Sequence, residues 1–409
     1  MEYSWVPFSL LSLVAVGVVW LIGSSDRWRE LRNLLLLGVL LRVVGSTLRL
    51  EVIDQAYGGF SDAKGYFNWG LIYSSNIADL DFGFIFSPPG PNERWWGTQF
   101  VRCVSGFGVL FTGSNIRAAF LLFSLFAFAG LVLCVAAFGR VFSQDDQLRY
   151  GRWVLLWPSL WFWPSSIGKE ALMLFAIGLL VFGYVGGGTS RNWLVLGIGL
   201  TLAAAIRPHV AALLAVAVTF SEFFQPGSLL NARRITGAAV AALVGVYTVV
   251  SSLSQLGIEE IDIEGIQEEI EFRSDNTVKG GSAIAQVGGP LAVPMAFTNV
   301  LIRPFPWEAR GLSIFSSLEV LTFWIVVLGR RRHWPSVLSK WRVNAFLRVG
   351  LPFALGLTFL YGITFANLGI IARQRVAVFP FLFTLLALTR LGAAERERDG
   401  ISEVALRVS

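Results

Sequence analysis

The stretch IRAAFLLFSLFAFAGLVLCVAAFG, residues 116–139, carries one charged side chain, that of Arg117. An apolar run of about 17 to 25 residues is long enough to cross the hydrocarbon core of a bilayer as a helix. The whole chain has a similar character, since 55% of its residues are hydrophobic and 15% are charged, whereas a soluble domain has roughly 25% charged residues. These observations predict a polytopic membrane protein.

Similar apolar runs recur along the chain. Every backbone polar group in hydrocarbon must be satisfied within the protein, and the runs lack the period-2 alternation of a membrane barrel strand. We therefore expect an all-α helical bundle of about eleven transmembrane helices, which form a single polytopic domain over residues 1–409. The expected spans are roughly 5–22, 33–49, 116–139, 150–164, 171–187, 192–206, 209–224, 235–255, 312–329, 345–366 and 376–390. The first run lacks a preceding basic region and an Ala-x-Ala end, so we expect a retained helix.

Basic residues are concentrated in alternate connections between these spans. By the positive-inside rule such connections are cytoplasmic, which predicts an outer N-terminus and a cytoplasmic C-terminus. The basic connections are 23–32, 140–152, the one with Arg191, the one with Arg233 and Arg234, 330–342, and the tail with Arg390, Arg396 and Arg398.

The two longest of the remaining connections, 50–115 and 256–311, are then large extracytoplasmic loops. The start of the second is acidic, which agrees with an outer location. The first contains the segment GGFSDAKGYF at residues 58–67, in which Asp62 lies among glycines and aromatic residues. Long loops that are not plain tethers are usually functional.

Five short polar segments fall on this predicted outer side. Ionisable groups at helix ends in a membrane protein are costly when unpaired, so they tend to line a cavity or a pathway. The candidates are Asp62 with Lys64 and Tyr66; Lys169 with Glu170; Arg207 with His209; Arg303 with Trp307 and Glu308; and Arg373 with Arg375.

Each segment also has a structural interpretation. Asp62 follows Ser61 and two glycines, which is ordinary turn chemistry, but its carboxylate could deprotonate an acceptor hydroxyl as a general base. Lys169 and Glu170 could pair at a helix start, or Lys169 could hold a phosphate as a point charge. Arg207 could extend to the interface or clamp an anion. His209 alone is more often structural than catalytic.

The two later segments are similarly ambiguous. Trp307 could belong to the aromatic belt at the interface or stack on a sugar. Arg373 and Arg375 precede a span on the side where arginines are not expected, so they need a counter-charge, and a lipid phosphate or diphosphate is the natural one.

Several other classes of site are excluded by the sequence. There is no Walker motif, dinucleotide fingerprint or nucleophile elbow. Two cysteines and two histidines do not make a metal cluster. The net charge of +6 comes from short loops that set orientation, so it does not indicate a nucleic-acid partner.

The pattern resembles the lipid-dependent membrane glycosyltransferases of the GT-C class, which include protein mannosyltransferases and arabinose transferases. The residues that carry the resemblance are Asp62 in the first outer connection and four short segments. These are PSSIGKE at 164–170, IRPH at 206–209, RPFPWE at 303–308, and NLG at 367–369 followed by Arg373 and Arg375. In that class an acidic residue of the first outer loop serves as the base, and Lys or Arg groups bind the phosphate of a polyprenyl-linked sugar.

The resemblance implies transfer of a sugar from a polyprenyl-phosphate-linked donor to a glycan, lipid or protein acceptor at the outer face of a bacterial or archaeal inner membrane. Asp62 would be the base, the cations and Glu170 would bind the donor, and Tyr66, Trp96 and Trp307 would stack on sugar or lipid. No cofactor is required, although a carboxylate-bound magnesium or manganese could bridge phosphates. Two alternatives remain open, namely a polysaccharide polymerase or ligase that uses lipid diphosphates with His209 as base, and a transporter or flippase of lipid-linked sugars.

Overall fold

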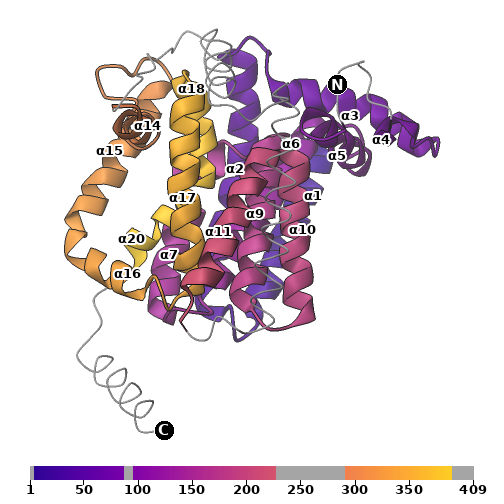
Figure 1. Ribbon diagram of the computed structural model, residues 1–409. Coiled ribbons are helices and arrows are strands. Elements are labelled where there is room, and N and C mark those ends of the chain that lie inside the picture. The colour runs from indigo at the N-terminus through magenta and orange to yellow at the C-terminus, as the bar shows by residue number, and fades with distance from the viewer. Residues whose placement is uncertain (1–3, 87–94, 227–290, 389–409) are drawn as a thin grey trace, which may run out of the picture.

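The computed structural model describes residues 4–86, 95–226 and 291–388, and all regular elements in these ranges are helices (Figure 1). The N-terminal half contains α1 (Trp5–Ser24), η1 (Arg29–Leu31), α2 (Arg32–Gln55), α3 (Asp62–Ala78), α4 (Gly83–Phe86), α5 (Thr98–Phe111), α6 (Ile116–Phe138), α7 (Gln144–Leu156), α8 (Pro158–Phe162), α9 (Lys169–Gly186), α10 (Ser190–Ile206) and α11 (Pro208–Phe224). The C-terminal part contains α14 (Ala292–Leu301), α15 (Ser313–Gly329), η4 (Arg331–His333), α16 (Trp334–Lys340), α17 (Ala345–Thr364), α18 (Leu368–Gln374), η5 (Arg375–Ala377), α19 (Phe379–Leu382) and α20 (Thr384–Ala387).

Fewer helices than expected are long and apolar enough to cross a membrane. Among the described residues these are α1, α6, α9 and α17, with a fifth if Leu368–Ala377 and Phe379–Ala387, bent by 59°, form one broken span. The all-helical class is confirmed for the described residues, and four or five helices could cross a membrane by length and composition, but the eleven spans are not confirmed. The expected span 150–164 is broken at Trp157, because Pro158 begins a new helix there and the residue before a proline disfavours the helical region. The expected span 235–255 lies outside the described residues.

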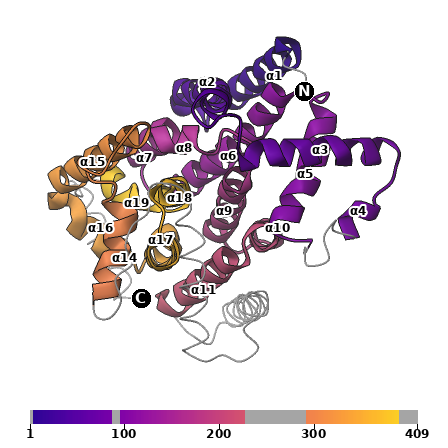
Figure 2. The ribbon, with the colours of Figure 1, turned by 90° about the horizontal axis from the view of Figure 1, so that it is seen from above.

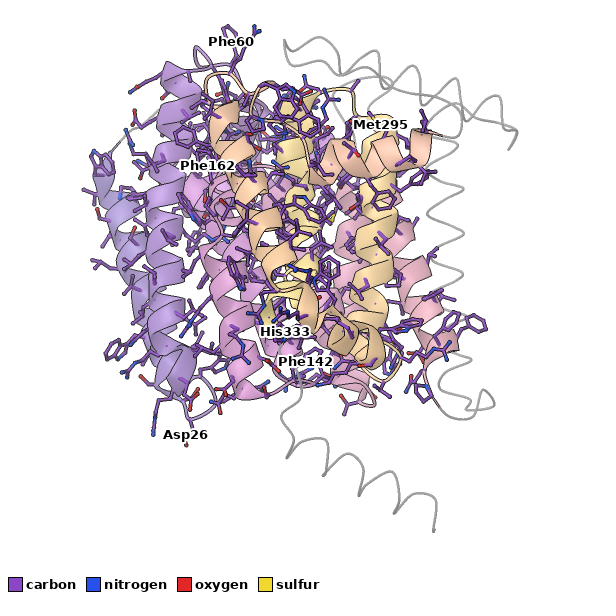
Figure 3. The ribbon with its side chains drawn as sticks, turned by 90° about the vertical axis from the view of Figure 1, so that its left-hand side faces the viewer. Asp26, Phe60, Phe142, Phe162, Met295 and His333 are labelled. Atoms are coloured by element: carbon purple, nitrogen blue, oxygen red, sulfur yellow. The ribbon has the colours of Figure 1, made fainter. Side chains whose placement is uncertain are left out.

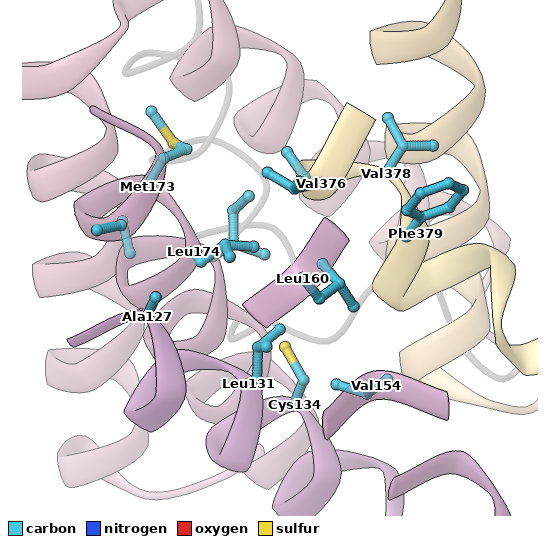
Figure 4. Packing of buried hydrophobic residues seen from close by; sticks show 14 of the residues in the cluster. Ala127, Leu131, Cys134, Val154, Leu160, Met173, Leu174, Val376, Val378 and Phe379 are labelled. Atoms are coloured by element: carbon cyan, nitrogen blue, oxygen red, sulfur yellow. The ribbon is translucent and has the colours of Figure 1, made fainter. Parts of the chain in front are cut away.

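The centre of the bundle is built on the close approach of α6 and α9. A Cβ atom added to Gly130 would meet the carbonyl of Leu174, and one added to Gly178 would meet the carbonyl of Gly130. Small residues that let two backbones approach in this way are typical of helix pairs in membranes. Figure 4 shows Leu131 and Cys134 of α6 packed with side chains of α7, α8 and α9 in the same core.

The connections between helices are gathered at two opposite ends of the bundle. Figure 3 places the labelled residues in two groups, with Asp26, Phe142 and His333 at one end and Phe60, Phe162 and Met295 toward the other. We call the first the basic end, because the adjoining connections carry Arg27, Arg140 and Arg330. The second is called the α3 end. The connections that carry Arg27, Arg140 and Arg330 therefore share one end of the bundle.

The predicted first outer loop is mostly helical. Residues 50–55 continue α2, and α3, α4 and α5 occupy most of the described remainder. Viewed from above, α3 and α5 lie across the end of the bundle (Figure 2). They are joined by a buried hydrogen bond from Gln99 Nε2 to Tyr73 Oη of 2.9 Å. Of the second predicted loop, residues 291–311 are described, and they contain α14.

Candidate functional site

Glu170 lies in the first turn of α9 and accepts contacts from two different elements. Its Oε1 is 2.9 Å from Arg207 Nη2 and 3.2 Å from Arg373 Nε. Gln374 Nε2 also donates to this oxygen at 3.4 Å, and Gln374 Oε1 accepts from Arg207 Nη1. A carboxylate suits the positive end of the α9 dipole. One buried carboxylate thus connects α9, the α10–α11 junction and α18.

Asp62 extends this network to the surface of the protein. It is the first residue of α3, after Ser61, whose side chain accepts from the backbone N–H of Lys64. Its Oδ2 is 3.3 Å from Arg373 Nη1, and its side chain is 68% exposed, whereas that of Glu170 is 9% exposed. Arg373 therefore bridges an accessible carboxylate and a buried one.

Lys169 and Tyr66 meet at Thr98, the first residue of α5. Lys169 Nζ donates to Thr98 Oγ1 at 3.1 Å, and Tyr66 also hydrogen-bonds Thr98. Burial raises the pKa of Tyr66 to about 12, and the nearby charge of Asp62 acts in the same direction. The phenol is therefore neutral at ordinary pH and can donate or accept a hydrogen bond. Thr98 is exposed, so this side of the cluster faces solvent.

Arg49 belongs to the same region, although the sequence analysis missed it. It is 5% exposed and lies within electrostatic reach of Glu170 and Arg373. Its guanidinium faces the ring of Trp163 at 4.9 Å, while its Nε and Nη1 have no hydrogen-bond partner among the described residues. Buried donors of this kind are costly unless an acceptor satisfies them.

Arg303 and Glu308 satisfy each other. Arg303 Nη2 is 2.5 Å from Glu308 Oε1, and Arg303 Nε donates to Oε2 at 3.0 Å. Burial alone would raise the pKa of Glu308, but the hydrogen bonds from Arg303 and from the backbone of Phe305 lower it below its ordinary value. Trp307 is 77% exposed and stacks on Phe305. The side chains of Arg303 and Glu308 bond to each other, to Asn299 of α14 and to the backbone of Phe305, so this segment forms a local clamp.

Arg375 does not share the surroundings of Arg373. It is fully buried and donates to the backbone carbonyl of Arg303 at 3.1 Å and to Ser316 Oγ. Two residues separated by one position point to different faces of a helix. The predicted arginine pair is thus divided between the network and the packing of α14 and α15.

Lys64 and His209 lie at the margin of the network. Lys64 Nζ forms an ion pair with Asp54 Oδ1 near the end of α2. His209 is half-buried in the first turn of α11, which Pro208 begins.

The network cluster is defined here as Arg49, Asp62, Tyr66, Thr98, Lys169, Glu170, Arg207, Arg373 and Gln374. Its four cations face two carboxylates, so the cluster has a net charge of +2. Both carboxylates are paired with arginines. No group of three or more His, Cys, Asp or Glu residues gathers in the described ranges, and these donors do not fit a resident divalent cation. The arrangement is suited to an anion.

Comparison with family models, with curated proteins and with solved structures found no match to this chain.

Proposed function

We propose that the protein is a membrane glycosyltransferase that takes a sugar from a polyprenyl-phosphate-linked donor. The single observation that carries the proposal is the continuous contact from exposed Asp62 through Arg373 to buried Glu170 and Arg207. It brings an accessible carboxylate within reach of a surplus of positive charge at one end of an apolar bundle. A base next to a phosphate site is what such a transfer requires.

The reaction uses these residues in distinct ways. The Asp62 carboxylate accepts the proton of an acceptor hydroxyl, whose oxygen forms the new bond to the anomeric carbon. The bond from that carbon to the phosphate oxygen breaks, and the lipid phosphate leaves with the bonding electrons. Lys169, Arg373 and Arg49 stabilise the charge that develops on the phosphate. Glu170 and Gln374 hold Arg207 and Arg373 in place and do not contact the reacting atoms.

The location of the cluster supports a lipid substrate. The network cluster lies where α9 and α11 begin, next to helices long and apolar enough to cross a bilayer. A polyprenyl chain can remain in the membrane there while its phosphate reaches the cations. With the basic end in the cytoplasm, the α3 end faces outward, toward a glycan, lipid or protein acceptor in the cell envelope of a bacterium or archaeon.

The test is transfer by the purified protein from a panel of polyprenyl-phosphate sugars. Asp62→Asn is expected to reduce the rate roughly 100- to 10,000-fold, the range typical of losing a general base. Asp79→Asn is the matched control, because Asp79 is an exposed acid at the other end of α3. It should leave the rate unchanged.

Other outcomes favour the alternatives. A mild effect of Asp62→Asn together with turnover of lipid diphosphates would favour a polymerase or ligase, and His209→Gln would then be the damaging change. Movement of a lipid-linked sugar from one leaflet of a vesicle to the other, without transfer of the sugar to an acceptor, would favour a transporter. Absence of both activities over the whole panel would reject the proposed transferase.

A further inference from the structure

A separate cavity opens at the basic end, away from the network cluster. Its volume is about 430 Å³, and its lining comes from α7, Trp157, the end of α15 and α20. Figure 1 shows α7, α16 and α20 together in this part of the molecule. The lining residues are Arg149, Arg152, Trp153, Leu156, Trp157, Arg330 and Leu386.

The cavity carries a surplus of positive charge. Arg149 pairs with Asp146 at 2.5 Å and also donates to the carbonyl of Ala387 at 3.1 Å. Arg330 Nη2 donates to the carbonyl of Leu388 at 3.1 Å. Arg152 is exposed. Three arginines thus face one carboxylate, and burial, followed by the charge of Arg149, lowers the pKa of Arg330.

Two enclosed N–H groups without a hydrogen-bond partner among the described residues lie beside this cavity. Trp157 is 5% exposed, and its Nε1 has no hydrogen-bond partner in the described part of the chain. Arg330 Nε also has no hydrogen-bond partner in the described part of the chain. Both side chains line the cavity. Both N–H groups are enclosed by protein, so the groups that can reach an anion in the cavity are the exposed Arg152 and the partly exposed head groups of Arg149 and Arg330.

The rest of the lining identifies the kind of anion. The tryptophans and leucines form apolar walls, which suit an amphiphile better than a fully hydrated ion. Basic pockets between helices on the cytoplasmic side are typical places for anionic lipid headgroups. We propose that this cavity binds the phosphate group of an anionic phospholipid through Arg149, Arg152 and Arg330, with the start of the acyl chains against the apolar wall. Among the described residues the lining includes no carboxylate or histidine.

The experiment measures retention of phosphatidylglycerol by the full-length protein in detergent, using native mass spectrometry over a lipid titration. Arg152→Gln is expected to weaken binding about tenfold, as the loss of one charge-assisted contact would. Arg191→Gln is the matched control, because Arg191 is exposed at the start of α10 at the same end of the bundle. It should bind like the wild type.

Phosphatidylcholine and inorganic phosphate separate the sources of the anion. Selective retention of phosphatidylglycerol, sensitive to Arg152→Gln and not to Arg191→Gln, supports the lipid site. Equal binding of inorganic phosphate with the same sensitivity would overturn the lipid assignment in favour of a soluble anion. Equal weakening by both arginine variants would mean that general surface charge, and not this cavity, holds the lipid. Absence of any retained phosphatidylglycerol would also overturn the lipid site. None of these results depends on the proposed transferase activity.

Discussion

Glu170 and Arg207 form a buried ion pair across 37 residues of sequence, with Oε1 and Nη2 2.9 Å apart. Because Arg373 contacts the same oxygen, removal of this one carboxylate leaves two arginines without their shared counter-charge. Glu170→Ala is therefore expected to lower the free energy of unfolding by about 3–5 kcal/mol, the range for breaking a buried pair from one side. Thermal unfolding in detergent measures the effect.

The control for this prediction is an ion pair at the surface. Asp26 and Arg29 are 2.8 Å apart, with side chains 93% and 69% exposed. Exposed pairs contribute little to stability, so Asp26→Asn should unfold at nearly the wild-type temperature. If Glu170→Ala also did so, the network would not depend on its central carboxylate.

Tyr66 provides a prediction on pH. Burial raises its pKa to about 12. The phenol therefore keeps its proton through the neutral and moderately alkaline range and loses it only near pH 12. Tyr66→Phe removes one hydrogen bond, worth about 1 kcal/mol, and should reduce transfer roughly fivefold without changing the shape of the pH profile between 6 and 10. Profiles of kcat/KM for both proteins test this. An alkaline decline near pH 10 that disappears in Tyr66→Phe would contradict the buried, neutral phenol.

Glu308 should contribute to stability in acid. Its pKa is lower in the folded protein than the ordinary value of 4.5. A lowered folded-state pKa stabilises the protein above the ordinary value, and this contribution is lost as the pH falls through the lowered value. Glu308→Gln should therefore flatten the decline in unfolding temperature below pH 4.5. An unchanged acid decline in this variant would mean that Arg303 does not hold the carboxylate in solution.

The sequence predicts the helical class and several of the apolar helices, because apolar length depends only on local composition, but it does not predict α3, α5 or α14, which lie in the connections expected to be loops. Asp62, Lys169, Glu170, Arg207 and Arg373 meet at the α3 end. The partners themselves depend on how helices pack, which sequence spacing does not contain. For this reason the sequence does not indicate that Gln374, which lies between Arg373 and Arg375, contacts Arg207 and Glu170.

The misplaced residues have equally specific causes. The expected span 33–49 stops at Arg49, whereas α2 continues to Gln55 and its packing buries the Arg49 guanidinium. Arg375 was grouped with Arg373, but helical geometry turns it toward Ser316. The span at 150–164 fails at Trp157, where Pro158 starts a second helix despite continuous apolar composition.

The most direct test of the account is the binding of polyprenyl phosphate to purified Lys169→Gln. Lys169 belongs to the network cluster and donates to Thr98. Lys340 at the end of α16 provides a lysine of equal charge at the basic end. The account predicts that Lys169→Gln weakens binding about tenfold, as expected for one charge-assisted contact, while Lys340→Gln binds like the wild type. Equal affinities for Lys169→Gln and the wild-type protein would contradict a phosphate site at the α3 end.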